Sequence, residues 1–151
     1  MDKVYVVTSG EYSDFGIDAI FATEELAQIF VDSFAVDDRS RELNITEWTL
    51  NPNEKYLKQN RNPYFLQINK KGDIRDICAC ESDRVNLFRT EISDAKIHFT
   101  KDLEWMNIAC FANNEEHAVK IASEKRSQIL AANLWGVLNL DDDEWDSILY
   151  N

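Results

Sequence analysis

Hydrophobic periodicity predicts that the chain begins with two strands joined by a long loop. Residues 3–8 are rich in β-branched side chains, as is typical of a strand. Residues 17–21 alternate between two faces, one of which is formed by Ile17, Ala19 and Phe21. The eight residues 9–16 between them indicate a hairpin with a long connection.

A helix is predicted directly after this hairpin. Thr23 is suited to cap it, and Glu24 and Glu25 fall in the first turn, where the helix dipole favours negative charge. An apolar stripe follows at helical spacing, formed by Leu26, Ala27, Ile29, Phe30 and Phe34. The first unit is therefore predicted to be β-β-α.

The rest of the chain repeats strand and helix signals after a polar connection. Residues 37–63 read as a surface connection around a short strand at 45–50. Gly72 suits a tight turn between two strands. Apolar patterns predict strands at 64–69, 74–80, 85–92, 96–100 and 105–111.

A long helix closes this second part. Asn113 or Asn114 is predicted to cap it, about 20 residues follow, and Gly136 is suited to stop it. The fold class predicted for residues 1–151 is one α+β domain, in which an antiparallel sheet of hairpins and a meander packs against two main helices.

Two strand-to-helix junctions resemble each other. Residues 21–27 and 111–118 both run from an aromatic residue through a polar cap and an acidic pair onto an alanine. One interpretation is an internal duplication of two β-β-α-like units, 3–36 and 64–136. The other is that unrelated junctions converge on the same capping chemistry.

The net charge of the chain bears on which partners this domain can contact. The chain has 28 Asp and Glu against 16 Lys and Arg, a net charge of −12. Such a surface repels nucleic-acid backbones and anionic lipids, and it attracts basic protein surfaces. The expected partner is therefore a protein with a basic surface, although solubility alone would also explain the charge.

The segment 138–151 combines acidic and large apolar residues. Acidic and aromatic positions are the candidate contacts, namely Asp141, Asp142, Asp143, Glu144 and Trp145. This alternation is typical of a segment that docks on a basic, apolar groove. It is equally compatible with a last amphipathic helix that closes the core.

Catalytic and metal-binding patterns are missing from the sequence. Cys78 and Cys80 form a C-x-C pair without a second knuckle, so no metal site is predicted, and on a strand they would share a face as small apolar groups. Neither His98 nor His117 belongs to a recognisable nucleophile motif, and the four glycines form no phosphate-binding loop. The sequence therefore predicts a protein without a cofactor that is not an enzyme.

The opening loop is the other candidate contact site. Glu11, Tyr12, Ser13 and Asp14 bring hydroxyls, an aromatic ring and two carboxylates together between two glycines. Tyrosine contributes much interface area for little conformational entropy, so a contact at the hairpin tip is one interpretation. The other is a self-packed loop, in which Ser and Asp bond to their own backbone.

Two blocks of sequence resemble known proteins. VYVVTSGEYSDFGIDAIFATEELA and FANNEEHAVKIASEKRSQILAANLW, about 50 of the 151 residues, are similar to small, mostly uncharacterised proteins encoded by phages and prophages of Gram-positive bacteria. The resemblance implies an α+β domain in a phage setting and no known reaction. In that setting the expectation is an anti-defence inhibitor that occupies a nucleic-acid-binding surface of a host protein.

Two other functions stay open at this point. One is an enzyme or small-ligand sensor whose site is assembled from distant residues, for instance Tyr12, Asp14 and His98. The other is a structural or assembly protein of a phage. No apolar run is long enough for a membrane span and no signal peptide is evident, so a cytoplasmic location is expected.

Overall fold

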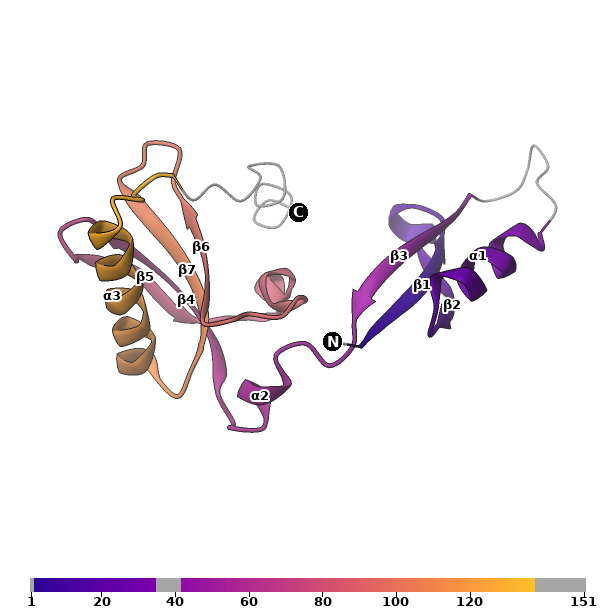
Figure 1. Cartoon of the computed structure of the whole chain (residues 1–151), viewed down its shortest axis with the longest axis horizontal. Coiled ribbons are helices and arrows are strands. Elements are labelled where there is room, and N and C mark those ends of the chain that lie inside the picture. Colours follow the sequence, from indigo (N-terminus) through magenta and orange to yellow (C-terminus); the bar gives the residue numbers. More distant parts are fainter. Residues whose placement is uncertain (1, 35–41, 138–151) are drawn as a thin grey trace. The chain divides into compact units, whose positions relative to one another are not determined.

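The described chain folds into two compact units of α+β type. The computed structural model describes residues 2–34 and 42–137, and its contacts divide at residue 51 into an N-terminal unit and a C-terminal unit (Figure 1). The α+β class is confirmed, with two antiparallel sheets in place of the single sheet that was expected. The interpretation of residues 1–151 as one domain stays a prediction.

The N-terminal unit is a three-stranded sheet with one helix on it. Strands β1 (Lys3–Ser9), β2 (Gly16–Phe21) and β3 (Leu43–Thr49) pair in the order β2-β1-β3, all antiparallel. This three-stranded sheet is called sheet A. Helix α1 (Glu24–Asp32) follows β2 directly, and the short 3₁₀ helix η1 (Tyr12–Asp14) lies in the predicted loop.

Helix α1 begins where its capping chemistry predicts. The Thr23 hydroxyl accepts a hydrogen bond from the Leu26 amide at 3.3 Å, and two glutamates occupy the first turn. The Phe30 ring packs against Phe21 of β2 with centroids 5.2 Å apart, which fixes the covered face of sheet A. The predicted apolar stripe is only partly used, because Ala27 is buried whereas Leu26 and Ile29 are exposed.

Strand β2 contains a bulge that breaks its predicted alternation. Val7 pairs with Ala19 but Thr8 pairs with Ile17, so Asp18 is the extra residue. Ile17 therefore lies on the same face as Thr8, opposite to Ala19. The expectation that Ile17 shares a face with Ala19 and Phe21 is wrong, since a bulge shifts the two-residue period by one.

The C-terminal unit is a four-stranded sheet covered by a long helix. Strands β4 (Asn62–Asn69), β5 (Ile74–Ala79), β6 (Ala95–Phe99) and β7 (Trp105–Ala112) pair antiparallel in the order β5-β4-β7-β6. This four-stranded sheet is called sheet B. Helix α3 (Glu115–Ala131) lies against one face of it, and α2 (Glu54–Leu57) precedes β4 (Figure 1).

Most of the buried apolar side chains belong to the C-terminal unit. Residues of β4, β6 and β7 pack with Ala118, Ala122 and Ile129 of α3 into the main cluster. On the opposite face of sheet B, the 3₁₀ helix η2 (Ser82–Phe88) buries Leu87 against Phe65 and Ala109. Sheet B is thus covered on both faces around its centre.

Strand β5, an edge strand like β2, is also irregular. Phe65 pairs with Cys78 but Gln67 pairs with Arg75, so the ladder shifts by one residue. Asp76 lies at this irregularity and has a positive φ of 54°. An aspartate thus marks the break in the outer strand of each hairpin.

Two expectations for the C-terminal unit are wrong. Residues 85–92 were expected as a strand, but residues 82–88 form η2, in which the i, i+3 spacing brings Leu87 into the core. Gly136 was expected to stop the long helix, but α3 ends at Ala131 and Asn133 takes the left-handed conformation with φ 56°. Asparagine is the second choice of residue for this role after glycine.

The two similar junctions have the same caps in different sheet positions. Asn114 accepts from the His117 amide at 2.9 Å, as Thr23 does from Leu26. However, α1 follows the edge strand β2, whereas α3 follows β7 inside its sheet. The capping chemistry is confirmed, and the duplication of 3–36 and 64–136 stays a prediction.

Candidate protein-binding surface

The opening loop forms hydrogen bonds within its own backbone and exposes its side chains. The Asp14 amide donates to the Glu11 carbonyl at 3.0 Å, and the Phe15 amide donates to the Tyr12 carbonyl at 3.3 Å. Gly10 has φ 77°, and a Cβ there would lie 2.2 Å from the Asp14 oxygen, so no larger residue fits. The loop therefore has a feature of each interpretation: its backbone is bonded to itself, and Tyr12 is 96% exposed.

The predicted contact residues fall into two groups. Glu11, Tyr12, Ser13 and Asp14 are brought together in the exposed loop. The other group lies outside the described residues, namely Asp141, Asp142, Asp143, Glu144 and Trp145. A contact role for either group stays a prediction.

Negative charge is concentrated in particular parts of the chain. Residues 1–51 have 11 Asp and Glu against 3 Lys and Arg, a net charge of −8. Residues 52–137 have 12 against 13, a net charge of +1, and the segment 138–151 has five acidic and no basic residues. The net charge of −12 is therefore not spread evenly, and residues 52–137 contribute almost none of it.

The N-terminal unit also exposes much apolar surface. Of the twenty buried apolar residues in the described ranges, only Val6, Val7 and Ala27 belong to it. Nine of its large apolar side chains are instead exposed: Tyr12, Phe15, Ile17, Ile20, Leu26, Ile29, Phe34, Trp48 and Leu50. Exposed apolar groups rimmed by charge are typical of a binding surface.

The acidic N-terminal unit also has a counterpart among protein families. Residues 2–57 match a domain of unknown function, DUF7336. The DUF7336 region covers sheet A, α1 and the short helix α2, so its end lies close to the unit boundary at residue 51. Neither the curated proteins nor the solved structures that were searched contain a match.

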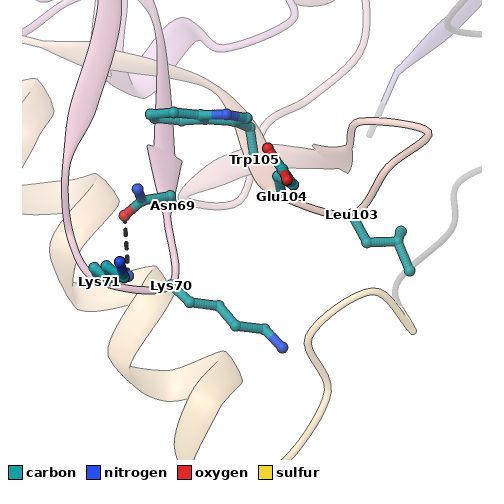
Figure 2. A pocket seen from close by; sticks show the side chains of 6 residues that line it. All are labelled: Asn69, Lys70, Lys71, Leu103, Glu104 and Trp105. Atoms are coloured by element: carbon teal, nitrogen blue, oxygen red, sulfur yellow. Dashed lines mark hydrogen bonds between the residues drawn. The ribbon is translucent and has the colours of Figure 1, made fainter.

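A pocket lies at one end of sheet B, outside the DUF7336 region. It has a volume of about 410 Å³ and is lined by Asn69, Lys70, Lys71, Leu103, Glu104 and Trp105 (Figure 2). The Asn69 side chain shapes one wall by accepting from the amides of Lys71, Gly72 and Asp73, each at 2.9 Å. The two lysines are opposed by Glu104 in the same lining, so the pocket has no strong preference for one sign of charge.

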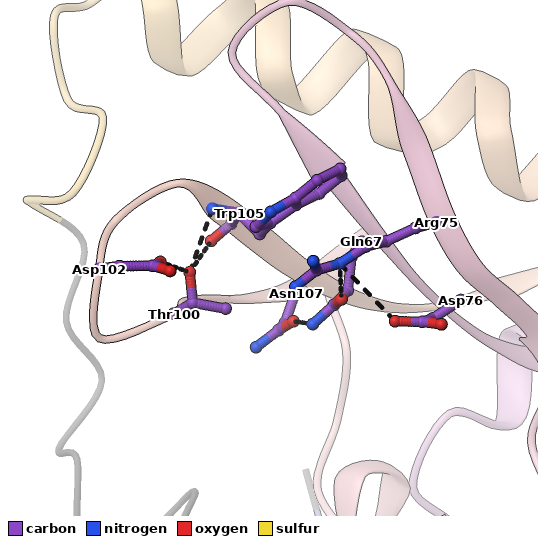
Figure 3. A network of polar contacts seen from close by, with 7 residues as sticks. All are labelled: Gln67, Arg75, Asp76, Thr100, Asp102, Trp105 and Asn107. Carbon is purple, nitrogen blue, oxygen red and sulfur yellow. Dashed lines mark hydrogen bonds and ion pairs between the residues drawn. The ribbon is translucent and has the colours of Figure 1, made fainter.

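The Trp105 ring beside this pocket is held by a polar network (Figure 3). The Arg75 guanidinium lies 4.0 Å from the ring centroid and donates to the Gln67 side chain, which in turn donates to Asn107. Asp102 accepts from the Thr100 hydroxyl, which together with the Glu104 amide lowers the pKa of its carboxyl. Sequence patterns did not reveal this network, because its members come from four separate segments.

The described residues contain no candidate metal-binding group. Among residues 2–34 and 42–137, no three His, Cys, Asp or Glu side chains form a group that could hold a metal ion. Tyr12 and Asp14 belong to the N-terminal unit and His98 to the C-terminal unit, so neither unit alone contains all three. No helix in these ranges is both long and apolar enough to cross a membrane.

The cysteines behave as small apolar groups. Cys78 and Cys80 both pack beside Phe65 and Leu87, which confirms that they share a face. Burial raises the pKa of Cys80 to about 12, with a smaller contribution from Cys78. Burial likewise raises the pKa of the Cys110 thiol to about 12, so both thiols stay protonated at neutral pH.

Proposed function

We propose that this chain is a non-enzymatic binding protein whose N-terminal unit holds a basic surface of another protein. One observation carries the proposal, namely that residues 1–51 have 11 acidic against 3 basic residues, whereas residues 52–137 are nearly neutral. If the acidic residues served only solubility, they would not need to be concentrated in the smaller unit. An acidic surface of this kind speeds encounter with a basic partner and rejects acidic ones.

The finer proposal concerns the kind of partner. A surface that binds nucleic acid presents lysines and arginines at phosphate spacing, and clustered carboxylates can occupy it in place of phosphates. The resemblance of the opening block to phage-encoded proteins supports a host protein as the target. We therefore propose an anti-defence inhibitor that competes with nucleic acid, with Tyr12 as an aromatic anchor.

Neutralising a few carboxylates tests this proposal. The triple variant Glu11→Gln, Glu24→Gln, Glu25→Gln removes three negative charges from the N-terminal unit, and we expect it to lose most capture of partners from a Gram-positive lysate at low salt. The matched control is Glu81→Gln, Glu115→Gln, Glu116→Gln. It removes the same charge from the C-terminal unit and includes the equivalent acidic pair at the start of α3.

Salt dependence supplies the second measurement. Wild-type binding should weaken steeply as ionic strength rises, because exposed charges are screened within about 8 Å at physiological salt. Equal loss of binding by both triple variants, or binding that ignores salt, would contradict the proposal.

Small-ligand binding is a second candidate function, favoured by the pocket beside Trp105. Its volume of about 410 Å³ falls in the range of ligand sites, and Asn69 and Arg126 hold the turn that forms one wall. Trp105→Ala should then raise the Kd of such a ligand, measured by isothermal titration calorimetry, because it removes the ring that lines the pocket. A ligand whose Kd is unchanged by this substitution would bind elsewhere.

A further inference from the structure

We infer that the partner docks on the open face of sheet A, which is the face opposite α1, and that it presents apolar side chains interspersed with lysine or arginine. This inference rests on the proposed function and adds where the partner binds and what chemistry it brings. Three observations carry it: the placement of side chains on the two faces, their exposure, and the position of the cation.

Strand register assigns side chains to the two faces of sheet A. Tyr5 pairs with Phe21, and Phe21 contacts Phe30 of α1, so the helix covers the face of Tyr5 and Val7. Val4, Val6 and Thr8 point to the other side because strand residues alternate. Their register partners complete the open face, which carries Ile17, Ile20, Asn44, Thr46 and Trp48.

On the open face Val6 and Thr8 of the central strand are buried, whereas large apolar groups of the two outer strands remain accessible to water. Ile17 is 50% exposed, Ile20 is 60% exposed and Trp48 is 45% exposed. They flank the central strand on both sides, since Ile17 and Ile20 belong to β2 and Trp48 to β3. The bulge at Asp18 is what brings Ile17 to this face, so the irregularity enlarges the apolar surface.

The charges around this face select the occupant. Within residues 2–34 and 42–51 the one cation is Lys3, which lies on the face of Tyr5 and pairs with Glu47 at 2.6 Å. Exposed carboxylates stand at the ends and edge of sheet A, at Asp2, Asp18 and Glu42. The N-terminal unit of a second copy would bring a further net charge of −8, and nucleic acid or anionic lipid would be repelled in the same way.

Three synthetic peptides of equal length can probe this face on the full chain. One alternates Leu and Lys, one alternates Ser and Lys, and one alternates Leu and Glu. We expect the Leu-Lys peptide to bind at least tenfold more tightly than either of the others, measured by fluorescence anisotropy of a labelled peptide. Failure to discriminate among the three peptides would overturn the inference.

Substitutions then locate the site. Ile20→Ser and Trp48→Ser should each raise the Kd of the Leu-Lys peptide at least tenfold. Leu57→Ser and Val85→Ser remove apolar groups of similar exposure, 55% and 53%, from the C-terminal unit and should leave the Kd within twofold. Ile29→Ser on α1 should also leave it within twofold, and a larger effect there than at Ile20 and Trp48 would move the site to the helix.

The outcomes separate this inference from the proposed function. Unchanged urea midpoints would show that a loss of binding by Ile20→Ser or Trp48→Ser is local, and Ile17→Ser provides a third variant if either one unfolds. Peptide binding that depends on Glu11, Glu24 and Glu25 but not on Ile20 and Trp48 would leave the proposed function standing and overturn the docking face. A dimer in light scattering that Trp48→Ser dissociates would also overturn it, in favour of self-association.

Discussion

Asn53 shows how much one residue can organise. It lies in the left-handed region with φ 62°, is 1% exposed, and donates from its side chain to the carbonyls of Phe88 and Thr90. Its side-chain oxygen accepts from the Ile92 amide at 2.7 Å, and its own amide donates to Glu91 at 2.6 Å. A single asparagine thus holds the segment that follows η2.

Substitution of Asn53 should be costly for this reason. Asn53→Ala leaves buried backbone groups without partners, each worth about 1–3 kcal/mol, so the free energy of unfolding should fall by about 2–4 kcal/mol in urea titrations. Asn60→Ala is the matched control, because Asn60 has φ 56° but an exposed side chain. It should cost about 1 kcal/mol, the backbone contribution alone, and equal losses at both positions would refute the role of the Asn53 side chain.

The buried thiols predict a pH dependence at the alkaline end. The pKa of Cys80 and that of Cys110 are about 12 in the folded chain, against about 8.5 for a free thiol. The unfolded chain therefore loses these protons first, so the stability they contribute is intact below about pH 8.5 and is lost as the pH rises towards 12.

Thiol reagents measure the same property directly. At pH 8 the fully buried Cys110 should react with a disulfide reagent only after urea unfolds the protein, since thiolate is the reactive form. The variant Cys110→Ala should show a shallower fall in melting temperature between pH 8 and 10.5. Rapid labelling of Cys110 in the native protein would show that its thiol is not enclosed.

At the scale of elements, the opening loop depends on one glycine and not on the other. Gly10→Ala should lower the free energy of unfolding by about 1–3 kcal/mol, because an alanine at φ 77° is strained and its Cβ meets the Asp14 carbonyl. Gly16→Ala is the control at the other end of the loop, where nothing lies within 4 Å of the added carbon, and it should be nearly neutral. Thermal unfolding of both variants decides the matter, and tolerance of Gly10→Ala would contradict the loop geometry.

Elements with regular periods could be predicted, and elements shaped by tertiary contacts could not. The hairpins, both caps and the helix starts follow from local chemistry, so Thr23 and Asn114 were identifiable from the sequence. Residues 85–92 have strand-like composition, but the core position available to Leu87 favours the tighter η2 turn. The bulge at Asp18 left no pattern in the sequence, and for that reason the open face could not be assigned before the register was known.

At the scale of the whole molecule, the two units differ in how well each fills its own core. Seventeen of the twenty buried apolar residues in the described ranges belong to residues 52–137. A fragment of residues 52–151 should therefore unfold cooperatively in urea. A fragment of residues 1–51 should show no cooperative transition by circular dichroism, because a chain of that length with three buried apolar side chains is marginal at best. Cooperative unfolding of the short fragment would show that residues 1–51 are stable without a partner that covers their exposed apolar side chains.

Composition predicted that charge matters, but not where it lies. The net charge of −12 is a property of the sequence, whereas the assignment of −8 to the N-terminal unit needs the boundary at residue 51; residues 52–137 carry +1 and residues 138–151 carry −5. Electrostatic repulsion of nucleic acid is accordingly expected from the N-terminal unit more than from residues 52–137.

The irregular pairing of the edge strands β2 and β5 bears on aggregation of the protein at high concentration. An outer strand with a continuous row of free amides and carbonyls is a template on which foreign strands add, as they do in fibrils. Asp18 and Asp76 interrupt that row and place a negative charge at each interruption. We therefore expect the two hairpins to be poor seeds for amyloid growth, although many apolar side chains in the described ranges are exposed.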